Sequence, residues 1–555
     1  MGVVPNSWKG VCQLGDDFNS STCNRKIIGA RYYLKGFEAE YGPVNRMFES
    51  RSARDMLAHG SLTSSIVVGR QVDNVSSPYG FARGTATGGA PLIRLAIYKV
   101  IWKIGEYDTV IVPADSLAAV DDAIHILSIS YGYSNHPTPL NQDLVSVVAL
   151  YAAKANVVVA ASAGNDGPKP ATAINTAPWL ITMGSSIIDG KFSSDIVLGT
   201  GLTVSEIVKP MGTLLLYAAV IPATKITPTK TVLGAKPAPI ANDFSSRGPN
   251  AATPFILKPD ITASGYYILG AWSGASRKYG DVKYGFLSGT SMSCPHVAGA
   301  MALLKAVHRD WSSAALRSAL MTTAGQLNNE GNPITTDYND TTTPFMIGSG
   351  YFNPTKAVDP GLVYDASFND YHLFLCSIGI HNLSSTKCLD NPPPPYNLNY
   401  PSLAIPDLKG TVTVVRTVTN VGCGKGVYYF SKVQSPKGIL VNIQPPVLKF
   451  DRAGEKKSFT ITVKTDSAFS GTIGKGEYLF GGEYAAPGVN ILAAWSEAIS
   501  PTRMPEDRRI VKYNIKSGTS MLCPHVTGAL ALLKAVHPNW SSAALRSALM
   551  TTSIY

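Results

Sequence analysis

The chain of 555 residues is 45% apolar and 15% charged, a composition typical of globular proteins that excludes a disordered one. Its length allows roughly two to four domains with sizeable cores. The net charge of +11 comes from scattered basic residues with no dense Lys/Arg block among aromatics, so we expect no nucleic-acid partner. No apolar run reaches the roughly 18 residues that a spanning helix needs, so we expect no membrane partner.

The N-terminus and the cysteines give conflicting indications of the compartment. The first twenty residues are polar and lack the apolar region of a signal peptide. Yet two short loops are flanked by cysteines at spacings that suit local disulfides: Cys12 with Cys23, and Cys376 with Cys388. The chain has seven cysteines, so at least one thiol is unpaired. N-x-[ST] sequons occur at Asn19, Asn74, Asn339, Asn382 and Asn539. These features favour an oxidising compartment, so we expect that further residues precede Met1.

Strand-like and helix-like segments alternate through residues 92–185. The pattern predicts strands at 92–102, 125–132 and 156–165, and helices at 143–155 and at 115–124, the latter with Asp115 as its N-cap. This alternation indicates an α/β fold with a parallel sheet covered by helices on both faces. Ligands in such folds bind beyond the carboxyl ends of the strands, which places the candidate site at Ser130–Gly132 and Ala161–Asn165.

The C-terminal part of the chain has a different pattern. Residues 391–396, NPPPPY, predict a stiff extended linker. Short β-rich runs separated by turn signals fill 397–480 and predict a small all-β sandwich. Residues 517–552 then repeat residues 288–323 with 31 identities in 36 positions. One near-identical copy indicates a duplication rather than a solenoid.

Each copy contains a serine in the sequence Gly-Thr-Ser-Met, Ser291 in the first and Ser520 in the second. An apolar helical pattern follows Ser291, and Pro295 suits the first turn of that helix. A helix N-terminus offers free backbone N–H groups and a favourable dipole to the oxyanion of an attacked carbonyl. Spacing alone favours a serine that only caps the helix, and His59 and Asn165, taken singly, fit structural roles.

Taken together, these motifs resemble one family. The order HG (59–60), SAGNDGP (162–168), FSSRGPN (244–250), KPDITASG (258–265) and GTSMSCPHVAG (289–299) is similar to that of the plant subtilisin-like serine proteases, the subtilases. The resemblance runs from Trp8 nearly to the end of the chain. It implies a seven-stranded parallel sheet with helices on both faces, a protease-associated insertion and a C-terminal fibronectin-III-like sandwich. It also implies secretion with a signal peptide and a pro-domain.

The resemblance assigns roles by motif. It implies Ser291 as the nucleophile, His59 as the general base and the side-chain amide of Asn165 as an oxyanion donor beside the Ser291 N–H. Two segments match those that flank the substrate chain, with which a peptide would pair as an added strand. Their residues are Ser130, Tyr131 and Gly132 in one, and Ala161, Ser162, Ala163 and Gly164 in the other.

The sequence departs from the family pattern at several motifs. The third triad residue, an aspartate in D-[ST]-G, does not occur in the 555 residues, and we expect it upstream of Met1. Ala58 replaces a glycine, Leu62 a second histidine and Ser264 a proline. The protease-associated insertion is reduced to a remnant at 201–232, which is too short to fold as a domain.

The sequence therefore predicts a peptidase domain (1–365), a connecting segment (366–396), an incomplete fibronectin-III-like domain (397–480) and a duplicated fragment (481–555). Ser520, in that fragment, has no histidine or asparagine motif of its own. The implied function is that of a serine endopeptidase acting through an acyl-enzyme on Ser291. The alternative is a catalytically inactive homologue or a fused gene product. We expect polypeptide substrates, no cofactor, no metal site and, from the resemblance, an extracellular location in the apoplast or cell wall.

Overall fold

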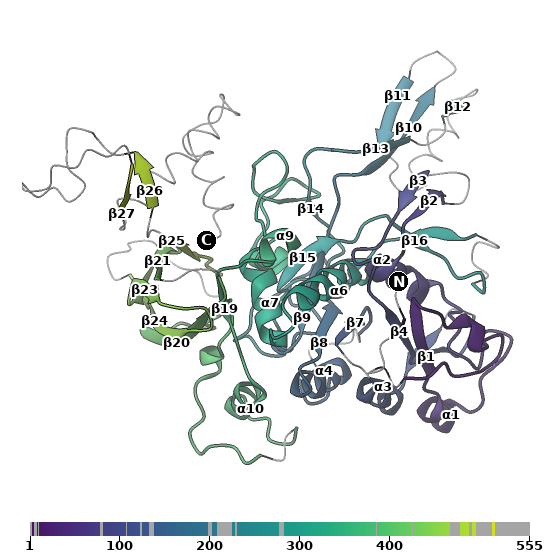
Figure 1. Cartoon of the computed structure of the whole chain (residues 1–555), viewed down its shortest axis with the longest axis horizontal. Coiled ribbons are helices and arrows are strands. Elements are labelled where there is room, and N and C mark those ends of the chain that lie inside the picture. The colour runs from purple at the N-terminus through teal and green to yellow at the C-terminus, as the bar shows by residue number, and fades with distance from the viewer. Residues whose placement is uncertain are drawn as a thin grey trace, which may run out of the picture.

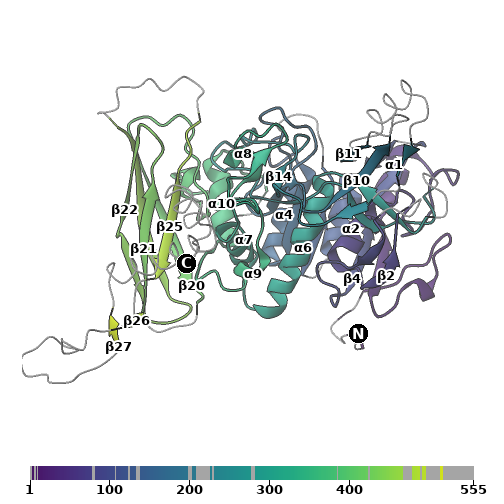
Figure 2. The ribbon, with the colours of Figure 1, turned by 90° about the horizontal axis from the view of Figure 1, so that it is seen from above.

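The computed structural model describes residues 3–516 except 5–7, 9, 78–81, 107, 123–124, 133–137, 198–202, 208–224, 228–229, 277–281, 384–385, 423–425, 467–477, 488–490 and 495–512 (Figure 1). Ser520 and its helix pattern lie outside these residues. A mixed α/β body makes up most of the described chain, and a β-sandwich adjoins one end of it (Figure 2). None of the described helices combines the length and the apolarity that crossing a bilayer requires.

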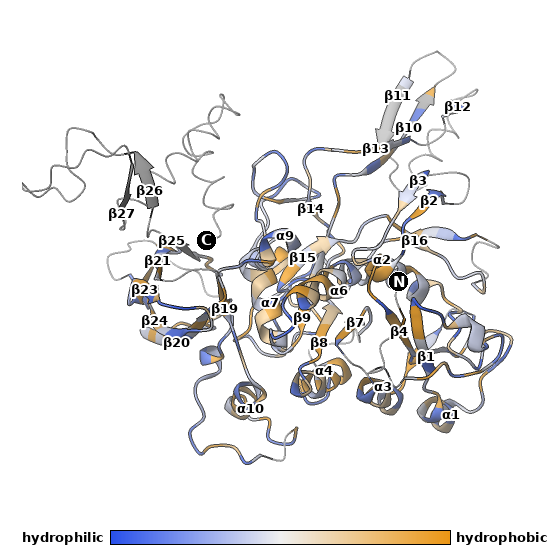
Figure 3. Ribbon diagram, in the orientation of Figure 1, coloured by the Kyte–Doolittle hydropathy of each residue, from blue (hydrophilic) through white to orange (hydrophobic). Residues whose placement is uncertain are grey.

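The central parallel sheet carries the candidate site. It places β7 (Ile126–Ile129), β8 (Val158–Ser162), β9 (Ile181–Ser186) and β15 (Ile261–Ser264) side by side in that order. Every residue of β8 and β9 is buried, because apolar and small side chains occupy both of their faces (Figure 3). The helices α4 (Leu144–Lys154) and α6 (Thr290–Val307) pack on this sheet (Figure 1). The predicted α/β architecture is confirmed.

The sheet is divided, in contrast to the single seven-stranded sheet that the resemblance implied. β1 (Ile27–Tyr32) and β4 (Leu95–Lys99) pair in parallel as a separate two-stranded sheet. Among the residues that the structure describes, no strand hydrogen-bonds to both β4 and β7.

The prediction that Asp115 caps a helix is wrong. α3 (Pro113–Asp121) begins two residues earlier, with Val112 as its N-cap, since Pro113 suits the first helical position. Asp115 is buried, and its carboxylate accepts hydrogen bonds from the backbone N–H groups of Gly36 and Phe37, both at 2.9 Å. It therefore joins α3 to α1 (Lys35–Tyr41).

The remnant of the insertion is part of a small antiparallel sheet. β10 (Lys191–Val197) pairs with β11 (Thr203–Ile207), β12 (Lys225–Ile226) and β13 (Lys230–Val232). This sheet extends away from the α/β body (Figure 1). It begins at 191, ten residues before the expected start at 201, because β10 supplies the strand with which the others pair.

The β-sandwich follows the linker, in which Pro395–Asn397 form a 3-10 turn rather than the expected extended segment. One sheet has the order β19 (Leu362–Tyr364), β20 (Thr411–Asn420), β24 (Lys456–Thr465) and β22 (Ile439–Gln444). The other has the order β23 (Val447–Phe450), β21 (Val427–Gln434) and β25 (Gly482–Pro487). Aromatic and aliphatic side chains, among them Phe450 and Phe459, fill the space between the two sheets.

Two strands come from outside the expected limits of the sandwich. β19 precedes residue 366, and β25 follows residue 480 and belongs to the duplicated segment. β25 pairs with β21 from Gly482 to Pro487, so the duplicated segment supplies an edge strand to the domain that we expected to be incomplete.

The duplication is also visible as a repeated hairpin. β16 (Ile268–Ala271) pairs antiparallel with β17 (Tyr284–Leu287) ahead of Ser291. β26 (Ile491–Ala494) pairs in the same way with β27 (Tyr513–Lys516) ahead of Ser520.

The remaining elements include α2, which carries His59, and α7 and α10, which pack against the main core. They are η1 (Ser20–Thr22), α2 (His59–Val68), β2 (Val72–Val75), β3 (Gly84–Ala86), β5 (Ile101–Lys103), β6 (Thr109–Ile111), β14 (Ile240–Ala241), α7 (Ser313–Thr322), β18 (Thr335–Thr336), α8 (Pro344–Ile347), α9 (Pro354–Ala357) and α10 (Phe368–Ser377).

Candidate active site

Ser291 lies in the first turn of α6, and its hydroxyl is hydrogen-bonded to the segment that follows β7. Its Oγ donates to the backbone carbonyl of Ser130 at 3.0 Å, and Ser130 Oγ donates back to the Ser291 carbonyl at 2.8 Å. The Ser291 carbonyl is available because Pro295, four residues later, has no N–H to donate to it. Pro295 thus lies in the second turn of α6, since the helix begins at Thr290, and not in the first turn as predicted.

The turn before Ser291 binds Asn165. Thr290 donates from its backbone N–H at 2.8 Å and from its hydroxyl at 3.0 Å to Asn165 Oδ1. Gly289 has a φ of 151°, and a Cβ there would lie 3.2 Å from Asn165 Nδ2, so glycine allows the amide to approach. Because Oδ1 accepts these two hydrogen bonds, the Nδ2 N–H groups of Asn165 remain available as donors at the start of α6.

His59 is the first residue of α2, and an aspartate holds the turn that precedes it. Asp55 Oδ1 accepts from the N–H groups of Leu57 and Ala58, both at 2.9 Å, and Asp55 Oδ2 accepts from Ser61 N–H at 2.7 Å. The bond to Ser61 satisfies one donor that the start of α2 leaves open, and the other two bonds hold the turn before the helix. Ala58 adopts the left-handed conformation with φ 68°, which the family's glycine would adopt without strain.

The His59 ring makes no hydrogen bond to any residue that the structure describes. It is half-buried, and desolvation lowers its pKa from 6.5, while the negative charge of Asp55 acts in the opposite direction. The imidazole is therefore neutral at pH 7, the state that accepts a proton.

An apolar cluster brings the two helix starts together. Ala58, just before α2, and Leu62 of α2 pack in one cluster with Met292 of α6 and Ile268 of β16. Leu62, which replaces the family's second histidine, is fully buried there. The structure thus places His59 and Ser291 at the ends of packed helices, with Asn165 beside the serine.

Asn175, which the sequence reasoning missed, joins the two segments expected to flank a substrate. Its Nδ2 donates to the Tyr131 carbonyl at 3.0 Å and to the Ser162 carbonyl at 2.8 Å. Ala161, Ser162, Ala163 and Gly164 are all buried, whereas Ser130, Tyr131 and Gly132 are half-buried. Asn175 has a positive φ of 55°, a conformation that asparagine tolerates, but this is visible only in the structure, and no signal in the sequence singled the residue out.

The four expected cysteines form two disulfides, Cys12–Cys23 and Cys376–Cys388, and Cys294 is a buried free thiol. Among the described residues, one group of side chains could hold a metal ion, and it consists of His372, Cys376 and Cys388. It lies at the Cys376–Cys388 disulfide and not beside Ser291.

Comparison with known proteins gives the family. Residues 30–350 match the model of the Subtilase family, and residues 397–485 match a Fibronectin type-III domain. Subtilisin-like protease SBT5.6 of Arabidopsis thaliana is 44% identical to the chain, with 87% of this chain and 76% of that protein covered. SBT5.5 of the same plant is 41% identical, covering 87% and 75%. Subtilisin-like serine-protease S of Lotus japonicus is 38% identical, covering 83% and 75%. The chain belongs to the subtilase family of serine proteases and is similar to its plant members.

Proposed function

We propose that this chain is a serine endopeptidase whose nucleophile is Ser291. Ser291 Oγ attacks the scissile carbonyl carbon while neutral His59 takes the hydroxyl proton and then passes it to the leaving amine. The resulting acyl-enzyme is hydrolysed by a water that His59 activates in the same way. Before attack, Ser291 Oγ leaves the Ser130 carbonyl by rotation about χ1.

The orientation of Asn165 is the observation that carries this proposal. Its oxygen is fixed by two hydrogen bonds from Thr290, at 2.8 and 3.0 Å, so its amide N–H groups face the turn that holds Ser291. A purely structural helix start has no need of a second, oriented donor next to its own free N–H groups. Together with the Ser291 N–H, this amide suits the oxyanion of a tetrahedral intermediate.

The repeated motif supplies a matched control for the test. We expect a fluorophosphonate probe to label the full chain on Ser291, with the label lost in Ser291→Ala and kept in Ser520→Ala. Mapping of the labelled peptide by mass spectrometry distinguishes the two sites. Label on Ser520 alone, or on neither serine of a folded sample, would contradict the proposal.

A catalytically inactive homologue is the second candidate. One observation favours it: no carboxylate among the described residues hydrogen-bonds to the His59 ring. Asp55 carries three backbone hydrogen bonds instead. An inactive homologue predicts no probe labelling and no peptide cleavage by protein whose circular dichroism is that of a folded chain.

We further propose polypeptide substrates and an extracellular location. The two disulfides support the location, since such bonds persist in oxidising compartments. The sequon at Asn19 is exposed and offers an acceptor for N-glycosylation. Protein recovered from the apoplast that shifts in mass on treatment with a glycosidase would agree with this proposal; protein found only inside the cell would not.

A further inference from the structure

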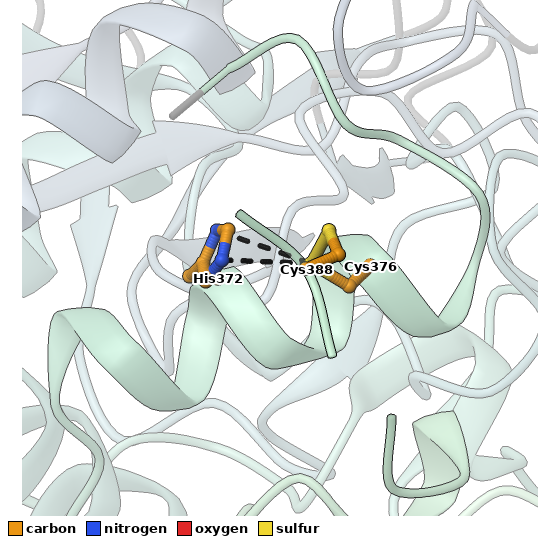
Figure 4. Close-up of side chains that lie close together, drawn as sticks. All are labelled: His372, Cys376 and Cys388. Atoms are coloured by element: carbon orange, nitrogen blue, oxygen red, sulfur yellow. Dashed lines mark hydrogen bonds between the residues drawn. A yellow bond between two sulfur atoms is a disulfide. The ribbon is translucent and has the colours of Figure 1, made fainter. Parts of the chain in front are cut away.

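Four sulfur- and nitrogen-bearing side chains gather where α10 meets the loop that follows it. His372 and Cys376 are four residues apart on α10, a spacing that places them on one face of the helix. The loop returns Cys388 to Cys376, and His381 lies next to Cys388. Figure 4 shows His372, Cys376 and Cys388 together, and their ligand atoms all lie within 4.8 Å of one another.

Two nitrogen–sulfur distances in this cluster are near those of a tetrahedral metal site, whereas the two sulfurs, joined as a disulfide, must separate before they can bind an ion and His381 must move closer to the other three side chains. His372 Nε2 lies 3.6 Å from Cys376 Sγ, and His381 Nδ1 lies 3.0 Å from Cys388 Sγ. Two ligands of a tetrahedral Zn²⁺, one nitrogen and one sulfur, are separated by about 3.5 Å, given the usual metal–ligand bond lengths. Two cysteines and two histidines are also a common ligand set of structural zinc sites.

The surroundings hold two of these side chains in place and leave the other two accessible. His372 and Cys376 are only 4% and 5% exposed. Their neighbours on α10, Phe374 and Leu375, pack into the main core and fix the helix. His381 is exposed and Cys388 is half-buried, so an ion reaches the cluster from the loop side.

We propose that Cys376, Cys388, His372 and His381 bind a Zn²⁺ ion when the Cys376–Cys388 disulfide is reduced. Two molecules of a low-molecular-weight thiol reduce the disulfide, are joined to each other as a disulfide, and leave two protein thiols. Zn²⁺ then displaces the two thiol protons and accepts lone pairs from one nitrogen of each neutral histidine. In the oxidised protein the sulfurs are bonded to each other and are not thiolates.

This arrangement keeps the loop attached to α10 in either redox state. A covalent bond holds the loop to α10 under oxidising conditions, and a metal ion holds it under reducing ones. The Cys12–Cys23 disulfide is the internal contrast, because the contacts described for Cys12 Sγ are the backbone carbonyls of Asn19 and Ser20, at 3.9 and 4.0 Å. The sequence analysis considered Cys376 and Cys388 only as a disulfide pair and did not connect His372 or His381 with them.

The test uses Co²⁺ as a spectroscopic substitute for Zn²⁺ on the full chain, reduced with a phosphine that is then removed without oxygen. We expect one equivalent of Co²⁺ to produce a thiolate-to-metal charge-transfer band and the visible bands of a tetrahedral site, both abolished by added Zn²⁺. The double variant Cys376→Ser/Cys388→Ser should lose the charge-transfer band. Cys12→Ser/Cys23→Ser, the matched control, should keep it.

The histidines are tested in a variant that keeps its disulfide during folding. His372→Leu/His381→Asn should weaken Co²⁺ binding to the reduced protein by at least about tenfold, since even outer-shell changes at metal sites have effects of that order. Zn²⁺ should raise the Tm of the reduced native sequence but not that of this variant. The proposal is overturned if reduced protein gives no charge-transfer band, if the band survives in Cys376→Ser/Cys388→Ser, or if oxidised protein binds the metal equally well.

Discussion

The serine side of the candidate site and its histidine side are held by different means. On the serine side, Ser291, Thr290, Ser130 and Asn165 are linked by hydrogen bonds between side chains and backbone. On the histidine side, hydrogen bonds hold the turn before His59 through Asp55, while the ring itself has no hydrogen-bond partner among the described residues. The proposed nucleophile and the proposed oxyanion donor are therefore oriented by hydrogen bonds, whereas packing alone orients the proposed base.

This difference indicates which part of the catalytic machinery the described chain supplies by itself. An oxyanion site needs only donors fixed in direction, which in our proposal are Asn165 and the start of α6. A base needs a defined tautomer, which a hydrogen bond to the second ring nitrogen normally sets. Asp55 acts on His59 through its charge and not through such a bond.

Asn165 carries the largest expected effect. Asn165→Ala should lower kcat by about 10²–10³, the usual result of removing one oxyanion donor. Asn165→Asp is the matched variant, since it keeps an acceptor for the Thr290 N–H but removes the donor. If oxyanion donation is the role, kcat falls in both variants while thermal stability falls only in the alanine variant. A loss confined to the alanine variant would assign Asn165 to structure alone.

Asp55 is expected to matter chiefly for stability. Asp55→Ala removes the acceptor of three backbone N–H groups and should lower the free energy of unfolding by about 1–2 kcal/mol, the effect of losing a helix cap. Asp55→Asn keeps one acceptor oxygen and should cost less. Urea unfolding curves measure both variants. Equal curves for the native sequence and Asp55→Ala would show that the hydrogen bonds of Asp55 contribute nothing to stability.

A smaller effect is expected on the serine side from Ser130→Ala. The substitution leaves the Ser291 carbonyl without a donor, because Pro295 cannot provide one, and should lower the free energy of unfolding by about 1 kcal/mol. Ser128→Ala is the control, since Ser128 lies on β7 two residues before Ser130 and its hydroxyl contacts Cys294 Sγ of α6, at 3.7 Å, instead of the Ser291 carbonyl. Unfolding by urea compares the two variants, and an equal loss in both would show that the bond to Ser291 contributes nothing.

Much of the core and the order of the site residues could be predicted from the sequence, because continuous apolar strands such as Val158–Ser162 and the flanking motifs are local signals. What escaped prediction depends on contacts between distant segments. The bond from Ser130 to the carbonyl freed by Pro295 requires β7 and α6 to be adjacent. The pairing of β25 with β21 assigns part of a duplicated segment to the sandwich. His381 joins its cluster only once the Cys376–Cys388 loop has closed.

The smallest expected effect, a shift in pH dependence, tests the histidine side most directly. Because burial lowers the pKa of His59 below 6.5, the base stays neutral and kcat/KM should decline only at a pH below that value. Asp55 opposes this shift through its charge, so Asp55→Asn should lower the pKa of His59 further and move the acid limb of kcat/KM to lower pH. Asn165→Asp is unsuitable here, since it adds a charge beside the serine; Ser130→Ala adds none and should leave the limb in place. An acid limb that stays in place in Asp55→Asn, or moves upward, would contradict the account in which the charge of Asp55 raises the pKa of His59.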